Sequence, residues 1–142
     1  MIDRKSNTVT PGFTKDDRSS FKYWFAHWCA FQMTALNLGV WRFKYLFHDW
    51  EKPWMRLIFP YSIVQKWHRT HRRHHPEYGE IHGFNKVDWD EMLIDWECCH
   101  YTKIAQPLNA PETLIALFQD KTYYSIMQKE MLPRLRKLIK NE

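Results

Sequence analysis

The segment Ser20–Gly39, SFKYWFAHWCAFQMTALNLG, has the pattern that decides the fold class. Its apolar residues recur three or four positions apart from Phe21 to Ala35, which is the spacing of one face of a helix. Ser19 or Ser20 can cap the start of this helix, and Gly39 follows the last periodic residue, where glycine commonly ends a helix. The segment therefore predicts a long amphipathic helix.

The next part of the chain continues the helical pattern. A second helix is expected from about Val40 to Lys52, with Pro53 ending it. A third is expected over YSIVQKWHRTHRRHH, between Pro60 and Pro76. The segment PEYGEIHGFNKV has two glycines and mixed polarity, so it is expected to be a loop.

Three further helices are expected in the C-terminal half. Asp88 and Glu91 have the spacing of a capping box at the start of the fourth helix. Asn109 starts the fifth, and a last helix covers roughly residues 121–140, with a possible kink at Pro133. Its basic amphipathic run, KEMLPRLRKLIK, is expected to dock on the bundle or to form a homodimer.

Length and composition fit one helical domain. The chain has 142 residues and only four glycines, and no run alternates with period two for more than a few residues. We expect an all-α protein, a single compact bundle of about five to six helices. Residues 20–142 form this domain, and residues 1–19 are expected to be a flexible lead. The eight tryptophans are expected mainly to fill the core.

The sequence predicts a cytoplasmic protein without a membrane partner. It has neither an apolar window of about eighteen residues nor a hydrophobic leader. Its three cysteines, Cys29, Cys98 and Cys99, have no CxxC spacing, so we expect reduced thiols.

Charge is divided between two blocks of the chain. The net charge is +5, and residues 42–75 carry eight lysines and arginines against Asp49 and Glu51. Residues 76–100 carry seven acidic residues against Lys86. The first block can attract an anion, and the second can hold a cation.

Five of the eight histidines fall between residues 66 and 83. On a continuous helix, His68, His71 and His75 share one face, and His74 lies about 100° away from His75. Because imidazole is a common ligand of divalent transition metals, the pattern is typical of a metal site. The alternative is a solvent-exposed basic patch.

The run FHDWEK, residues 47–52, is the second metal signal. On a helix, His48 and Asp49 can both reach a metal beside it, and Lys52 lies one turn after His48, next to any anion that the metal holds. The alternative is a surface pair. His27 could equally be a core histidine, and Asp95, between Ile94 and Trp96, could pair with a lysine or arginine.

The order His27, His48–Asp49 and Asp95 on successive helices resembles the HD-domain superfamily of helical, metal-dependent phosphohydrolases. HDWEK is similar to the HDxxK form of the HD-GYP phosphodiesterases and of the di-iron oxygenases with the same fold. HHPEYGEIHG resembles the double-histidine segment that holds a second metal. In pattern, the chain most resembles a small, mostly phage-encoded HD-like family, which would place it in the host cytoplasm.

The resemblance implies roles for individual residues. It makes His27, His48, Asp49 and Asp95 ligands of one metal, with Asp49 bridging to a second. His68 with one or both of His74 and His75 would hold the second ion. Lys52 would act with Asp49 in catalysis and would bind phosphate, together with the positively charged residues Arg69, Arg72 and Arg73. The GYP signature is absent, so specificity for cyclic di-GMP is not implied.

These observations lead to three hypotheses. The first is a phosphohydrolase or phosphodiesterase of a nucleotide or related phosphate ester, with one or two divalent ions among Mn, Fe, Zn, Ni and Co. The second is a di-iron oxygenase of the same fold. The third is a non-enzymatic binder of nucleic acid or of a partner protein, in which HRTHRRHH contacts phosphates.

Overall fold

The computed structural model describes residues 20–102, 109–118 and 124–140. The fold is all-α, as predicted. The α-helices are α1 (Phe21–Asn37), α2 (Glu51–Met55), α3 (Tyr61–His71), α4 (Pro76–His82), α5 (Lys86–Glu97), α6 (Ala110–Phe118) and α7 (Tyr124–Lys140). Two 3-10 turns, η2 (Phe43–Phe47) and η3 (Cys98–Tyr101), precede α2 and follow α5. Residues 1–19, the predicted flexible lead, lie outside the described residues.

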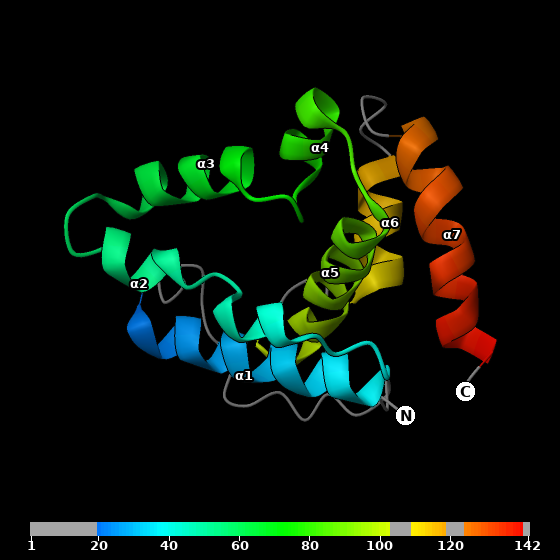
Figure 1. Cartoon of the computed structure of the whole chain (residues 1–142), viewed down its shortest axis with the longest axis horizontal. Helices are drawn as coiled ribbons and strands as arrows, with labels where there is room; N and C mark the ends of the chain where they lie inside the picture. Colours follow the sequence, from blue (N-terminus) through cyan, green and yellow to red (C-terminus); the bar gives the residue numbers. More distant parts are fainter. Residues whose placement is uncertain (1–19, 103–108, 119–123, 141–142) are drawn as a thin grey trace.

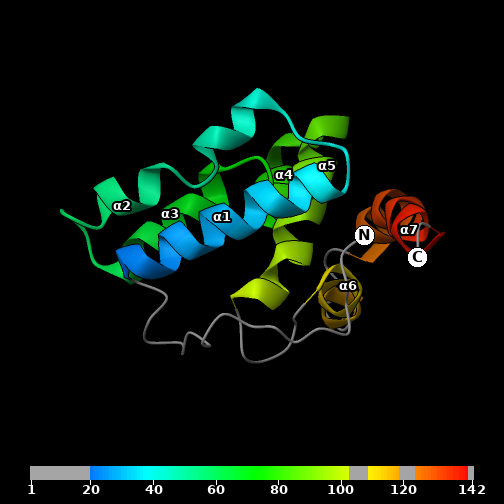
Figure 2. The same cartoon turned by 90° about the horizontal axis from the view of Figure 1, so that it is seen from below.

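Helix α5 is the central element of the bundle, between α1 and the pair α6 and α7 (Figure 1). One side of α5 packs Ile94 into a core with α1, η2 and η3. Its other side packs Trp89, Met92, Leu93 and Trp96 against α6 and α7. Helices α2 and α3 form a hairpin whose connection lies at the end of the molecule opposite α7 (Figures 1 and 2).

The predicted starts of two helices are confirmed by their caps. The Ser20 side chain accepts a hydrogen bond from the Tyr23 N–H at the start of α1. The Asn109 side chain accepts one from the Glu112 N–H at the start of α6. Each cap satisfies a backbone donor that the first turn of a helix leaves without a partner.

The helix predicted over residues 40–52 is wrong. Residues 43–47 form a 3-10 turn, and Asp49 has φ 55°, a left-handed conformation that ends any helix before α2. Pro53 does not end a helix either. It lies in the first turn of α2, where the missing N–H costs no intrahelical bond.

Helix α3 is shorter than predicted, because it ends at His71 and Arg72 is extended. His74 and His75 therefore lie on a loop, and the predicted common face of His68, His71 and His75 does not exist. Pro76 begins α4, in a segment predicted to be a loop, and so acts as a first-turn residue.

The capping box of α5 lies three residues earlier than predicted. Asn85 caps the helix: its Oδ1 accepts from the Asp88 N–H, and Asp88 Oδ2 accepts from the Asn85 N–H, both at 2.9 Å. Arg73 Nε donates to the same Asp88 carboxylate at 3.1 Å. The box therefore also ties the histidine loop to the start of α5.

No helix in the described parts of the chain is long and apolar enough to span a bilayer.

Asn85→Ala should lower the free energy of unfolding by about 1 kcal/mol, because the first turn of α5 loses its capping acceptor. Asn85→Ser keeps an acceptor and should lose much less. Lys86→Ala, at the exposed next position, is the control for a change at this turn. Urea denaturation of the three variants measures the differences. Equal stability of Asn85→Ala and Lys86→Ala would contradict the role of the cap.

Candidate metal centre

Six of the seven predicted metal ligands converge on one buried cluster: His27 from α1, His48 and Asp49 from the turn before α2, His68 from α3, His74 from the following loop, and Asp95 from α5. We name these six residues the His/Asp cluster. All are buried except Asp95, which is partly exposed. His75, the seventh, borders it, with its ring centroid 4.6 Å from that of His68 and 4.3 Å from that of His74.

The left-handed turn at Asp49 directs the His48 and Asp49 side chains into the cluster. His48 is held from one side by the Phe31 ring, stacked 3.7 Å away between centroids. Trp24 Nε1 donates to the Asp49 carbonyl at 2.8 Å, which fixes the turn against α1. Aspartate is among the few residues that tolerate a positive φ, so one residue supplies both the turn and the carboxylate.

Two further carboxylates orient the histidines from behind. Glu91 Oε1 lies 3.3 Å from both His48 Nδ1 and His74 Nδ1. Glu51 Oε1 lies 2.5 Å from His68 Nδ1. Because a carboxylate only accepts hydrogen bonds, each Nδ1 is the donor, and in a neutral ring the lone pair is then on Nε2. All three Nε2 atoms face Asp49.

When the histidines are neutral, the centre of the cluster is therefore a convergence of acceptors. Asp49 Oδ1 lies 3.1 Å from His68 Nε2 and 3.4 Å from His74 Nε2, and none of these three buried atoms has a hydrogen-bond partner. His75 Nε2 is also buried without a partner. Buried polar atoms are normally satisfied, and a set of lone pairs facing one point is satisfied by a cation.

The ligand atoms of His27, His48, Asp49 and Asp95 are spaced to fit a single ion. His27 Nε2 lies 3.3 Å from His48 Nε2, 3.1 Å from Asp95 Oδ1 and 3.6 Å from Asp49 Oδ2. Ligand atoms about 2.1 Å from a tetrahedral ion are about 3.4 Å apart. The cluster could thus hold a metal ion here, and His68, His74 and His75 form a second such group. Asp49 lies between the two groups.

Burial and mutual attraction set the protonation of the cluster. Burial would raise the pKa of Asp49, but His48, Lys52 and His68 outweigh it and hold the pKa well below its usual value. The pKa of Asp95 is also held low, by His27 and His48, against the effect of burial. The carboxylates therefore remain charged.

The histidines differ from one another in basicity. Burial would lower the pKa of His74, but the nearby carboxylates of Asp49 and Glu91 raise it to about 10. Burial lowers the pKa of His75 well below its usual value. A proton on His74 thus supplies positive charge where a metal ion would, and a bound ion would have to displace it.

The remaining predicted site residues lie outside the cluster. Lys52 Nζ contacts Asp49 Oδ2 at 2.5 Å, so it stands at the edge of the site. Arg72 pairs with Glu51, Arg73 pairs with Asp88, and Arg69 is exposed on α3. His71 and His82, the other two of the five histidines between residues 66 and 83, are exposed; His71 stacks on Trp67.

Sequence reasoning missed Glu91 and Glu51 as partners of the histidines. Glu91 had a usable signal, because it lies four residues before Asp95 and so shares its face of α5. Glu51 had none, since its position depends on the unexpected turn at Asp49.

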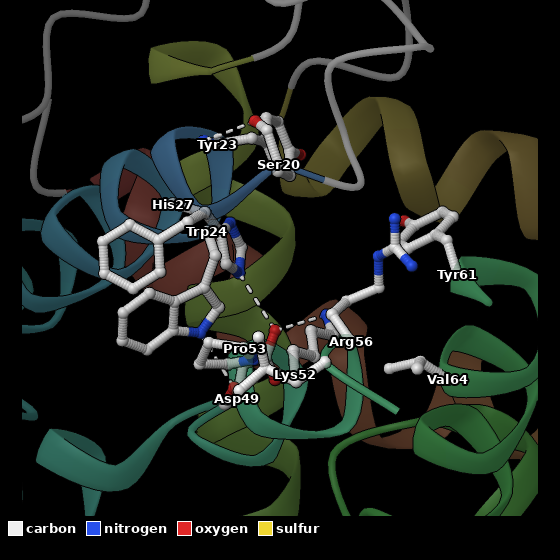
Figure 3. Close-up of a pocket in the computed structure, with 12 residues that line it drawn as sticks. Ser20, Tyr23, Trp24, His27, Asp49, Lys52, Pro53, Arg56, Tyr61 and Val64 are labelled. Atoms are coloured by element: carbon white, nitrogen blue, oxygen red, sulfur yellow. Dashed lines mark hydrogen bonds and ion pairs between the residues drawn. The ribbon is translucent and has the colours of Figure 1, made fainter. Parts of the chain in front are cut away.

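A pocket of about 270 Å³ opens beside the cluster (Figure 3). His27, Asp49 and Lys52 form one part of its wall. Trp24, Tyr61 and Arg56 are among the other lining residues. The pocket brings an ammonium and a guanidinium within reach of any ligand that contacts the cluster.

The fold and the site together define a class of protein: an all-α protein with a buried His/Asp cluster that is suited to a metal. The chain matches no protein-family model, no curated protein and no solved structure.

His48→Ala with Asp49→Ala should remove most bound metal. Both groups then lose Asp49, which lies between them, and the group of His27 and Asp95 also loses His48. Elemental analysis of protein purified without chelator measures this. His71→Ala, which removes a histidine outside the cluster, should retain the metal of the unmodified chain. Equal metal content in the double variant and the control would refute the assignment.

Glu91→Gln should weaken metal binding about 10- to 100-fold, because a neutral amide orients and polarises His48 and His74 less well. Asp90→Asn is the matched control, since Asp90 is on the same helix but faces Arg134. Competition with a chromogenic chelator gives both affinities. A loss of affinity in the control as large as that in Glu91→Gln would argue against this role.

Proposed function

We propose that the protein is a metal-dependent phosphohydrolase of the HD-domain type that hydrolyses a small phosphate ester. The observation that carries the proposal is the shared pocket: His27 and Asp49 of the His/Asp cluster and the ammonium of Lys52 border the same cavity. A metal ion and a cation on one side of a cavity suit a substrate whose reacting group is an anion.

His27, His48, Asp49 and Asp95 would hold one ion, and His68 with His74 and His75 a second, with Asp49 between them. Such ions act as Lewis acids on a phosphoryl oxygen and lower the pKa of water. In the overall reaction, the oxygen of water bonds to phosphorus as the ester P–O bond breaks, and the protons of water end on the phosphate and on the released alcohol.

Lys52 is the residue best placed to bind the substrate phosphate. Burial would lower its pKa, but Asp49 raises it, so the side chain remains an ammonium. It points at Asp49 Oδ2, next to the position that a phosphate oxygen would take at the cluster. There it would neutralise charge that builds up on the phosphate in the transition state.

Arg56 lines the pocket, whereas Arg69, Arg72 and Arg73 are not among its lining residues. We therefore place the second phosphate contact at Arg56 rather than at the three arginines that the sequence pattern suggested. The hypothesis of a nucleic-acid binder is less supported, because His68 and His74 of HRTHRRHH face inward and Arg72 and Arg73 have carboxylate partners.

Lys52→Met should lower the rate of phosphate release about 10²- to 10³-fold, because the transition state loses one cationic contact. The measurement is a screen of nucleotides and simple phosphate esters with added manganese, followed by kinetics on the best substrate. Lys66→Met, an exposed lysine on α3, is the matched control and should keep the full rate.

Metal content is measured in the same samples, so that loss of the ion and loss of the contact are separated. Absence of phosphate release from every ester with a fully metal-loaded protein would refute the proposal. Iron-dependent oxygen uptake under those conditions would instead support the oxygenase of the same fold.

A further inference from the structure

Exposed apolar side chains are concentrated at the connection between α2 and α3. Leu57 and Ile58 are 79% and 77% exposed, and Trp54 is 59% exposed. Phe59 and Ile63 are exposed as well. We name these five residues the apolar tip. Large side chains that remain this exposed next to one another mark a surface that binds something. Trp54 is also one of four exposed tryptophans, with Trp41, Trp50 and Trp67, so the tryptophans fill the core less than expected.

The apolar tip lies in a segment without acidic residues. Between Glu51 and Glu77 the sequence has no aspartate or glutamate and has six lysines and arginines. Two of these, Lys66 and Arg69, are exposed on α3, where Ile63 and Trp67 are also exposed. Because successive helical residues are about 100° apart, the two cations and the two apolar residues lie on adjoining parts of the solvent-facing side.

We propose that the apolar tip docks on a membrane surface that carries anionic lipids. Apolar and aromatic side chains enter the boundary between headgroups and acyl chains, while neighbouring lysines and arginines contact the headgroup phosphates. This mode of binding needs no spanning helix, so it is compatible with the absence of one among the described residues. It departs from the sequence-based expectation of no membrane partner.

The shape and charge of the tip argue against other occupants. The connection protrudes at one end of the molecule, and of the five tip residues only Leu57 lines the pocket beside the His/Asp cluster, so a small ligand there would leave most of the tip uncovered (Figures 1 and 2). A second copy docked tip to tip would bring like charges together. Nucleic acid would satisfy the cations, but it offers no apolar medium for Leu57, Ile58 and Ile63.

The inference is independent of the proposed hydrolysis, because it depends only on the outer surface of α2 and α3. The two surfaces nevertheless meet, since Arg56 and Leu57 also line the pocket at the His/Asp cluster. A docked molecule would therefore have the rim of this pocket close to the headgroups.

Co-sedimentation of the full chain with vesicles tests the proposal. Vesicles of phosphatidylcholine with phosphatidylglycerol should pellet the protein, vesicles of phosphatidylcholine alone should pellet far less, and added salt should weaken binding. Leu57→Asp with Ile58→Asp should lower the bound fraction about tenfold or more, since two charged groups replace the inserted side chains. Lys66→Glu with Arg69→Glu should also weaken binding to the anionic vesicles.

Leu36→Asp is the matched control, because Leu36 is 61% exposed but lies on α1. It should bind the anionic vesicles as the unmodified chain does. Thermal melting and metal content show that each variant is folded. Failure of the unmodified chain to bind anionic vesicles, or equal binding by the tip variant, would overturn the proposal. So would a dimer of the unmodified chain, in size-exclusion chromatography, that the tip variant loses.

Discussion

The burial of the Asp49 carboxylate among imidazoles is the interaction on which the rest of the structure depends. A lone carboxylate in this position would be very costly, because burial removes its hydration. Its cost is offset by Lys52 on one oxygen and by the histidines that face the other. The left-handed turn, the break between α2 and the preceding 3-10 turn, and the early end of α3 all serve to bring these partners to it.

The cluster has more negative charge than fixed positive charge can balance. Four carboxylates surround the histidines: Asp49, Asp95, Glu51 and Glu91. Lysine or arginine contacts three of them, through the pairs Lys52–Asp49, Arg72–Glu51 and Lys44–Glu91. Asp95 has only His27 and His48 as described partners. Neutral imidazoles cannot complete the balance, so the cluster must take up either protons or a metal ion. This competition is the physical basis of a metal centre built from histidine and aspartate.

Much of the fold could be predicted from local signals, but the turns could not. The apolar period of α1 and the caps Ser20 and Asn109 are local, and the structure has them where they were predicted. The helix predicted over residues 40–52 was wrong. Its apolar pattern continues through Asp49, but the contacts of Trp24 with the Asp49 carbonyl and of Phe31 with the His48 ring select a different backbone there. The order of the histidines and aspartates along the chain indicated most of the histidines that lie together in the structure. It could not reveal Glu51, whose position follows from that turn.

Helix α5 has almost no face left for solvent. Glu91 and Asp95 face the His/Asp cluster, Trp89, Leu93 and Trp96 face the C-terminal helices, and Ile94 packs against α1. Since each residue turns a helix by about 100°, the insertion or deletion of one residue within α5 would exchange these faces and bring tryptophan to the cluster and carboxylates to the core. Helix α5 thus has one permitted register, so its length is constrained as strictly as the residues of the His/Asp cluster.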